Sequence, residues 1–369
     1  MTVVFSIILS FYCLLLLAFL FGWVRVRRQT MPNRGNSVAC ISIVVAVRNE
    51  EENIQSLIHD LSTIAYPLEK FEVVIVNDHS TDGTYEKAKS LITDFSNMRL
   101  FDLSDQWQGK KAALQLGIEE ANFNIIATTD ADCRFSKNWL QCLTPYFEEV
   151  DSKMVVGAVK LISNNSFFAR LQVAEFISLT GSTAAAIGLT HPIMCNGANL
   201  AFRKDVFNEV KGYAGDFQIA SGDDEFLMRK ILNVYPDGIK FMNFYGAVVS
   251  SHPQRTIPDL FYQRLRWASK WKHNSDRFAQ LMAVFIFVSQ VAFVGLIITN
   301  FHAPDGSLSL VMGKLFLEGV FLFWVSRFLE SRFDMLAFLA LQILYPIYVT
   351  VIGLSSLLTS YRWKERNYK

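Results

Sequence analysis

The chain has 369 residues, of which 51% are hydrophobic and 19% are charged, and its 35 lysines and arginines nearly balance 34 aspartates and glutamates. This composition excludes a disordered chain, and the formal net charge of +1 argues against a dedicated nucleic-acid binder. The apolar residues gather towards the two ends, which predicts a membrane protein with a soluble middle.

Residues 3–24 are almost wholly apolar and long enough, as a helix, to cross a hydrocarbon layer roughly 30 Å thick. A cleaved signal peptide is the alternative, but no basic residue precedes the run, and Arg25, Arg27 and Arg28 follow it. We therefore expect a retained anchor over residues 1–24. Since basic flanks stay on the cytoplasmic side, the N-terminus is expected outside and the following residues inside.

The five cysteines, Cys13, Cys40, Cys133, Cys142 and Cys195, are odd in number and form no C-x-x-C pair. This spacing fits neither a zinc site nor a disulfide framework. Reduced thiols in a cytosolic domain are the expected state.

Residues 38–277 alternate between short β-branched runs and stretches with helical periodicity, which predicts a parallel α/β sheet with helices on both faces. The polar clusters 48–52, 77–82 and 130–132 each follow a predicted strand. Ligands bind beyond the carboxyl ends of such strands, so these clusters are expected to meet in one crevice. The predicted strands are 38–47, 71–76, 98–103 and 124–129, and the predicted helices are 54–61, 85–95 and 109–118.

Asp130 and Asp132 stand two apart after a buried strand, where both carboxylates can face one side. Hard divalent cations prefer such oxygen ligands, and Mg²⁺ is commonly held by one or two carboxylates plus substrate phosphates. A solvated turn is the alternative. For Asp78, which also ends a strand, hydrogen bonding to a nucleotide competes with a simple Asx-turn. Lys110 opens a helix, where it either pairs with phosphate or is solvated.

Asp223 and Asp224 enter a predicted helix, and two adjacent carboxylates suit a general base. The alternative is an acidic first turn favoured by the helix dipole. Further on, Gln263, Arg266 and Trp267 form a Q-x-x-R-W sequence, with Trp271 four residues later. Indoles stack on sugars and arginine forks match phosphates, but a helix at the membrane surface is an open alternative.

Taken in order, these segments resemble the membrane-bound family 2 glycosyltransferases, whose catalytic domain has the GT-A fold. The resemblance covers roughly residues 40 to 275. Its pieces are ISIVVAVRNEEENI, VNDHSTDGT, GKKAALQLGI, the D-x-D at Asp130 and Asp132, NGANLAFRKDVF, GDDEFL and Q-x-x-R-W.

The resemblance implies a nucleotide-sugar site. In it, Asp78 contacts the nucleotide base, Lys110 lies near the donor, and Asp130 and Asp132 hold the sugar nucleotide with its Mg²⁺ or Mn²⁺. Asp132 is expected more directly on the metal.

The resemblance also implies an acceptor side and inversion by a single displacement. Asp224 is the expected base, with Asp223 as the alternative. Gln263, Arg266 and Trp267 are expected to close over the diphosphate and acceptor. The residues implied to line the acceptor side are Asn196, Gly197 and Asn199.

Three residues depart from the family pattern. Asn77 replaces the first carboxylate of an Asp-Asp pair, His79 stands where Gly or Ser is common, and Asp223 stands where Glu is usual. His252 is a possible additional metal ligand, although a lone loop histidine is more often structural.

The C-terminal membrane region, residues 278–360, contains predicted spans at Phe278–Thr299, Leu308–Val325 and Met335–Leu358. Three spans starting inside place the basic tail, residues 361–369, outside, against the positive-inside tendency. Either one segment is interfacial or re-entrant, or the charge rule fails. Leu308–Val325, which carries Lys314 and Glu318, is the expected irregular segment.

The predicted function is an inverting glycosyltransferase of the cell membrane, with a cytoplasmic catalytic domain. It moves a sugar from a UDP- or GDP-sugar to a lipid-linked or growing glycan acceptor. Processive polysaccharide synthesis and a non-catalytic, membrane-tethered nucleotide-sugar binder are the alternatives. A nucleotidyltransferase is disfavoured because the Gly-rich phosphate loop expected near the first strand is missing.

Overall fold

The computed structural model describes residues 1–29, 38–148, 150–162, 166–215, 217, 221–270, 276–302, 304, 306–358, 361–363 and 366–368. Trp271 lies outside these residues. The chain forms two compact units. The sheet unit comprises Arg27–Ile162 and Thr190–His252, and the helical unit comprises Met1–Val26, Ser163–Leu189 and Pro253–Lys369.

The four predicted strands are present and pair in parallel, in the order β3-β2-β1-β4. β1 and β2 are buried almost throughout because they are continuous apolar runs in the middle of the sheet. Their bounds are Ile41–Val47 (β1), Phe71–Asn77 (β2), Met98–Asp102 (β3) and Ile125–Thr128 (β4).

Three further strands, β7, β5 and β8, extend the sheet beyond β4. β7 runs antiparallel to both β4 and β5, while β8 is parallel to β5. The seven-stranded sheet is therefore mostly parallel, as predicted. The added strands are Leu200–Arg203 (β7), Met154–Val156 (β5) and Ile239–Phe241 (β8).

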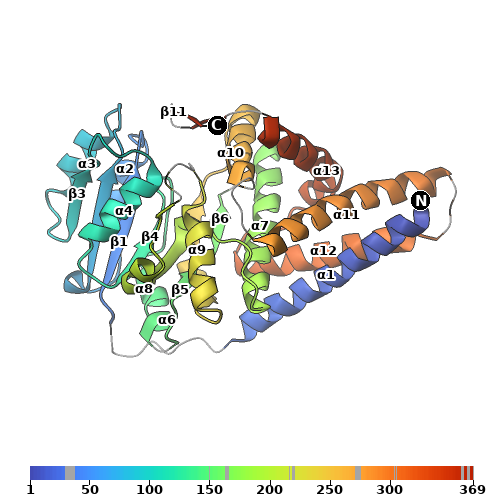
Figure 1. Ribbon diagram of the computed structural model, residues 1–369, viewed down its shortest axis with the longest axis horizontal. Coiled ribbons are helices and arrows are strands. Elements are labelled where there is room, and N and C mark those ends of the chain that lie inside the picture. Colours follow the sequence, from blue (N-terminus) through green and yellow to red (C-terminus); the bar gives the residue numbers. More distant parts are fainter. Residues whose placement is uncertain are drawn as a thin grey trace. The chain divides into compact units, whose positions relative to one another are not determined.

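Helices pack on this sheet, with α4 lying against β1 and β2 (Figure 1). Gly117 of α4 makes this close approach possible, because a Cβ placed there would lie 2.4 Å from Cγ1 of Val44. Helix α3 ends at Ile92, three residues before the predicted end. The helical segments of the unit are Ile54–Ser62 (α2), Leu68–Lys70 (η1), Thr84–Ile92 (α3), Lys110–Glu120 (α4), Trp139–Leu143 (α5), Pro145–Glu148 (α6), Gly197–Asn199 (η2), Lys204–Glu209 (α8), Asp223–Val234 (α9) and Tyr245–Ala247 (η3).

The chain that follows Asp132 forms a backbone bridge with a small two-stranded sheet. β6 (Val159–Leu161) and β9 (Val249–Ser251) pair in parallel. Arg134 forms a bridge with Ser250 of β9, through two backbone hydrogen bonds of 2.8 Å. The bridge holds Ser251 close to the D-x-D turn.

Glu72 of β2 is a buried carboxylate that joins neighbouring elements. Its oxygens accept hydrogen bonds from Ser42 of β1 (2.6 Å), Arg99 of β3 (2.8 Å) and the Asn122 side chain (2.7 Å). Burial alone would raise the pKa of Glu72, but these donors hold it below its ordinary value of 4.5. The ionised carboxylate is therefore the stabilising form.

We expect Glu72→Gln to lower the stability of the detergent-purified protein by about 1–3 kcal/mol at neutral pH, because buried donors lose their charged acceptor. The contribution of Glu72 is fully present above its unfolded-state pKa and is lost as the pH falls through the lower, folded-state pKa. Thermal unfolding measured from about pH 7 down to about pH 3 tests this pH dependence. The wild type should lose stability in acid more steeply than Glu72→Gln, and exposed Glu69→Gln serves as the control. Equal slopes for wild type and Glu72→Gln would contradict the assignment.

Among the residues that the structure describes, the helical unit contains four helices that are long and apolar enough to cross a membrane, α1, α11, α12 and α13. α12, which covers residues 308–325, is a continuous helix, and its expected interfacial placement stays a prediction. The helices of the unit are Thr2–Arg28 (α1), Phe167–Gly188 (α7), Ile257–Ser269 (α10), Arg277–His302 (α11), Leu308–Phe328 (α12) and Met335–Leu358 (α13). The sequence patterns give no prediction for α7.

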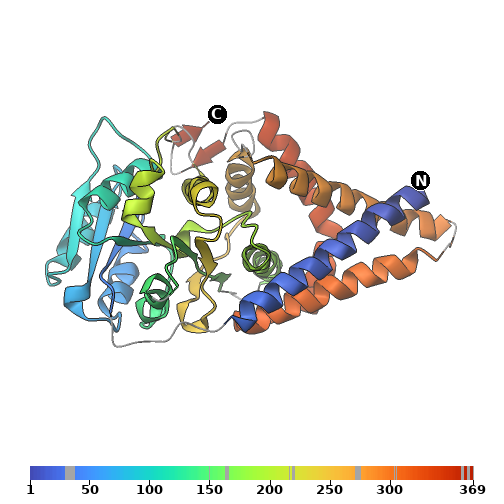
Figure 2. The same cartoon turned by 60° about the horizontal axis from the view of Figure 1, so that its bottom comes forward.

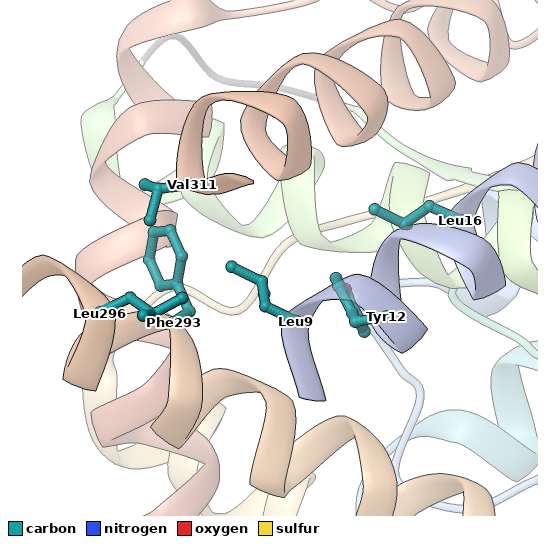
Figure 3. Packing of buried hydrophobic residues seen from close by; sticks show 6 residues of the cluster. All are labelled: Leu9, Tyr12, Leu16, Phe293, Leu296 and Val311. Carbon is teal, nitrogen blue, oxygen red and sulfur yellow. The ribbon is translucent and has the colours of Figure 1, made fainter. Parts of the chain in front are cut away.

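α1 runs beside α12 in the same direction, blue beside orange in Figure 2. Phe19 meets Phe321 with ring centroids 6.4 Å apart, and Trp23 meets Phe328 at 5.6 Å. Nearer the N-terminus, α1, α11 and α12 share an apolar cluster (Figure 3). Its buried members are Leu9, Tyr12, Leu16, Phe293, Leu296 and Val311.

The two charged residues of α12 compensate each other inside this bundle. Lys314, whose side chain is 1% exposed, lies 3.0 Å from the Glu318 carboxylate one turn later. Tyr12 of α1 donates to Glu318 at 2.7 Å, Gln342 of α13 accepts from Lys314, and Phe293 of α11 presents its ring 4.0 Å from the Lys314 ammonium. One polar cluster thus joins all four apolar helices. Charges within an apolar bundle persist when paired in this way.

Glu318→Gln is expected to destabilise the protein in detergent by about 3–5 kcal/mol, because it leaves the Lys314 ammonium buried without its counter-ion. The double variant Glu318→Gln, Lys314→Met removes both charges and should recover most of the loss. Thermal unfolding and the yield of monodisperse protein provide the measurement. If the double variant is no more stable than Glu318→Gln, pairing between Lys314 and Glu318 does not account for the two charges within this apolar helix.

The residues predicted as a basic tail contain two short antiparallel strands, β10 (Tyr361–Trp363) and β11 (Arg366–Tyr368). β10 lies beside α10, the helix that leads towards α11. At the other end of α13, Asp334 bonds Arg170 of α7 at 2.8 Å. Pro346 lies inside α13. The segment before α13 therefore contacts α7, and the segment after α13 contacts α10.

Candidate active site

The loops after β1 and β2 are joined by Arg48, the first residue beyond β1. Its guanidinium donates to the backbone oxygens of Asp78 (2.7 Å) and His79 (2.6 Å). Asn49 follows with φ +49°, and its side-chain oxygen accepts from the amide of Thr81 at 2.8 Å. These contacts fix the turn after β2 relative to the β1 strand end.

Asp78 is buried at the end of β2, with 3% of its side chain exposed. Both carboxylate oxygens accept from the backbone N–H of Gly109, at 3.1 and 3.2 Å, and the His79 ring lies 3.2 Å away. Gly109 has φ +96°, a conformation that favours glycine, and it sets the start of α4. Asp78 thus positions the N-terminus of α4.

The family departure at Asn77 has a local reason. Its side-chain amide donates to Asp102 at the end of β3, at 2.7 Å. A carboxylate at position 77 would face Asp102 with like charge and no proton to donate. Asn77 therefore connects the ends of two neighbouring strands.

Lys110, the first residue of α4, joins the D-x-D turn to the acidic pair. Its ammonium lies 2.7 Å from Oδ1 of Asp130 and 3.3 Å from Oδ2 of Asp223. Burial would lower the pKa of Lys110, but these two carboxylates raise it above its ordinary value. The lysine is therefore a fixed positive charge between two acidic loops.

Gly197 lies against the acidic pair at the start of α9. Its N–H donates to Asp224 at 3.0 Å, and its carbonyl accepts from Thr128 of β4 at 2.9 Å. A Cβ added at Gly197 would lie 3.1 Å from the Asp223 carboxylate and 3.7 Å from the Lys110 ammonium. The glycine is thus held between β4 and α9, where a side chain would crowd the charges.

Asn196 and Asn199 have different surroundings. Asn196 accepts from the Ala198 amide at 3.0 Å and begins the short helix η2. Asn199 is buried; its amide donates to the backbone oxygens of Ala158 and Ala247, both at 2.8 Å, and accepts from the Trp139 indole. Through these bonds, Asn199 stabilises the loop that contains Gly197.

Asp132 differs from Asp130 in its electrostatic environment. Burial, together with the negative charges of Asp130 and Glu50, raises the pKa of the Asp132 carboxyl. Its contacts are weak ones from the Cys133 thiol (3.7 Å) and the Ser251 hydroxyl (3.5 Å). The carboxylate is therefore poorly compensated, which is the environment that a cation would stabilise.

Asp130, Asp132 and Cys133 offer ligand atoms that lie within 4.8 Å of one another. Oxygen ligands suit Mg²⁺ or Mn²⁺, whereas a thiol is a soft ligand, so the two aspartates fit such an ion and Cys133 does not. Within the described part of the chain, His252 is not a member of this group. Sequence reasoning missed Cys133 and Ser251, although Cys133 directly follows the D-x-D.

Most of the predicted site residues that belong to the sheet unit are thus connected by direct contacts that involve Lys110, Gly109 or Gly197. The three Q-x-x-R-W residues belong to α10 of the helical unit. There Gln263 and Trp267 both contact the side chain of Arg264.

Acidic loops follow strands of a mostly parallel sheet, and the same chain has apolar helices long enough to cross a membrane. Residues 42–211 match the model of Glycosyl transferase family 2. The chain carries a family 2 glycosyltransferase domain, and the predicted family is confirmed.

Two curated relatives share 27% identity with this chain. One is the glycosyltransferase AglE of Haloferax volcanii, over 226 residues, 61% of this chain and 71% of that protein. The other is the poly-beta-1,6-N-acetyl-D-glucosamine synthase of Staphylococcus epidermidis, over 251 residues, 66% of this chain and 57% of that protein. A shorter match, 33% over 145 residues, is to the beta-monoglucosyldiacylglycerol synthase of Nostoc sp.; it covers 38% of this chain and 30% of that protein.

A solved structure supports the fold over nearly the whole chain. The mannosyltransferase PcManGT from Pyrobaculum calidifontis, in complex with GDP-Man and Mn²⁺, aligns with 97% of this chain and 99% of its own. The TM-score is 0.60 and the sequence identity is 17%. This likeness shows the GT-A fold together with its appended helices.

Proposed function

We propose that the protein is an inverting, metal-dependent glycosyltransferase that acts at the cytoplasmic face of the membrane. It transfers a sugar from a UDP- or GDP-sugar to a lipid-linked or growing glycan acceptor. The observation that carries the proposal is the Lys110 ammonium between Asp130 and Asp223. This contact joins a D-x-D turn to a separate acidic pair, so donor and acceptor chemistry can share one site.

The donor is proposed to lie along the loops that end β2 and β4. The nucleotide base would lie at Asp78 and His79. The diphosphate would lie near Lys110 at the N-terminus of α4, whose backbone amides suit an anion. Asp132, with Asp130, would hold Mg²⁺ or Mn²⁺. Bound there, the ion would neutralise charge on the departing nucleoside diphosphate. The solved mannosyltransferase relative holds GDP-Man and Mn²⁺, which supports this assignment.

Asp224 is the proposed base. Lys110 neutralises Asp223 through an ion pair at 3.3 Å, and the Asp224 carboxylate is oriented by the Gly197 amide. A base held at a fixed angle beside the acceptor loop of Asn196 and Gly197 can take the proton of a sugar or lipid hydroxyl. A single displacement with one base needs no covalent nucleophile.

The acceptor is proposed to come from the membrane. Four helices are long and apolar enough to span it, and one relative is a beta-monoglucosyldiacylglycerol synthase. Gln263, Arg266 and Trp267 are proposed to cover the diphosphate and acceptor. A second relative is a polysaccharide synthase, so product length decides between a single addition and processive synthesis.

Turnover of a panel of UDP- and GDP-sugars by the detergent-purified protein tests the roles of the carboxylates. We expect Asp132→Ala to lose divalent-metal-dependent donor binding and at least about 100-fold in nucleotide release. Asp224→Asn should bind donor normally and lose about 100- to 10,000-fold in turnover, since only proton transfer is removed.

Exposed Asp94→Asn is the control and should keep wild-type turnover. Undiminished nucleotide release by both active-site variants would overturn the assignment of roles. Donor binding without turnover under any condition would favour the non-catalytic binder.

The position of β10 beside α10 also generates a prediction on topology. α10 follows the catalytic residues, so the C-terminal strands are expected on the cytoplasmic side. With the N-terminus outside, this requires that only two of α11, α12 and α13 cross the membrane. A protease-cleavable tag appended after Lys369 should be cut only in inside-out vesicles. A tag before Met1, the control, should be cut only in right-side-out vesicles. Cleavage of the C-terminal tag from outside would contradict the arrangement.

A further inference from the structure

Arg264 lies inside the Q-x-x-R-W sequence without being one of its defining residues. Its guanidinium forms two parallel bonds to Glu175 of α7, Nε to Oε1 at 3.2 Å and Nη2 to Oε2 at 2.7 Å. The two side chains are only 6% and 11% exposed. Burial alone would lower the pKa of Arg264, but the Glu175 carboxylate raises it, so the guanidinium is a buried cation.

The same guanidinium contacts two of the motif's defining side chains. Nη1 of Arg264 donates to the side-chain oxygen of Gln263. The guanidinium carbon lies 4.3 Å from the ring centroid of Trp267, one helical turn later. Phe176 of α7 also lies near this indole, with ring centroids 6.4 Å apart. Gln263 and Trp267 are therefore oriented by one charged group.

The partners of Arg264 come from two other helices. Glu175 is on α7, and its Oε1 also accepts from the Tyr348 hydroxyl of α13 at 3.3 Å. One turn earlier on α7, Gln172 bonds the backbone of Gln254, accepting at 2.8 Å and donating at 3.0 Å. α7 thus contacts both the segment that leads into α10 and the motif itself.

We infer that Glu175, Arg264 and Tyr348 are positioning residues that fix the rotamers of Gln263 and Trp267 for the transfer reaction. The inference rests on the proposed role of the Q-x-x-R-W residues. A planar guanidinium can bond a carboxylate through two N–H groups of one edge, donate to an amide and lie over an indole at once, whereas a lysine ammonium cannot. The geometry of the motif therefore depends on a carboxylate outside it.

Turnover and donor binding of single and double variants test the inference. We expect Glu175→Gln to lower kcat about 10- to 100-fold with donor affinity nearly unchanged, because misplacing a contacting group by about 1 Å costs this much. Glu175→Asp, which keeps the charge, should recover part of the loss. Tyr348→Phe removes one hydroxyl and should lower kcat about 2- to 5-fold without affecting folding.

Coupling separates positioning from general support. If Glu175 acts through the motif, Glu175→Gln combined with Gln263→Ala should be no worse than the more impaired single variant. Losses that multiply would overturn the inference. The matched control is Asp334→Asn, which removes the 2.8 Å ion pair of Arg170 at the start of α13 and keeps an acceptor for the helix cap. It should change kcat less than about 3-fold, as expected for a site without coupling.

The positioning role of Glu175 and the proposed role of the motif would be contradicted by different results. If Gln263→Ala and Trp267→Ala lose turnover while Glu175→Gln and Tyr348→Phe match Asp334→Asn, the positioning role is wrong and the motif's role stands. If Gln263→Ala and Trp267→Ala both retain full turnover, the proposed role of the motif is wrong, and the inference falls with it.

Discussion

The sheet unit depends on one lysine ammonium placed between carboxylates from distant parts of the chain. Two like charges a few ångströms apart in a partly buried site repel by several kcal/mol, on the order of 4 at 4 Å. Lys110 meets Asp130 after β4 and Asp223 at the start of α9, and it can do so because Gly109 is bound by Asp78. The convergence of the loops is thus an electrostatic consequence of where α4 begins.

The same lysine makes the carboxylates unequal. Asp130 and Asp223 are compensated by a fixed positive charge, whereas Asp132 faces Asp130 and Glu50 and has a raised pKa. Charge balance therefore favours a divalent cation on the Asp132 side of the site. Asp224, next to the compensated Asp223, is bonded by the Gly197 amide. In the site that we propose, one ammonium thus separates the carboxylate assigned to the metal from the carboxylate assigned as base.

The sequence predicts those parts of the fold that have a local cause. β1, β2 and β4 are continuous apolar runs followed by turn-forming polar residues, so the strands and the nearness of the loops that follow them could be predicted. β5, β7 and β8 are only three or four residues long, and β7 is set by antiparallel pairing with strands on both sides. The pairing of Lys110 with Asp223 has no local pattern at all. In the helical unit, the spacing of four residues between Lys314 and Glu318 is visible in the sequence, but their pairing and the partners from the other helices are not.

The two buried ion pairs of the helical unit divide its tasks. Lys314–Glu318 involves side chains from all four apolar helices, so it fixes the bundle. Arg264–Glu175 connects α10 to α7, and through Tyr348 to α13, so any movement of α13 acts on a charged pair in contact with Gln263 and Trp267. Ion pairs with little access to water are directional and costly to break. One of the apolar helices, α13, therefore also bears on the site that we propose: its Tyr348 bonds Glu175, which pairs with Arg264, and Arg264 contacts the side chains that we assign to the acceptor side of the transfer.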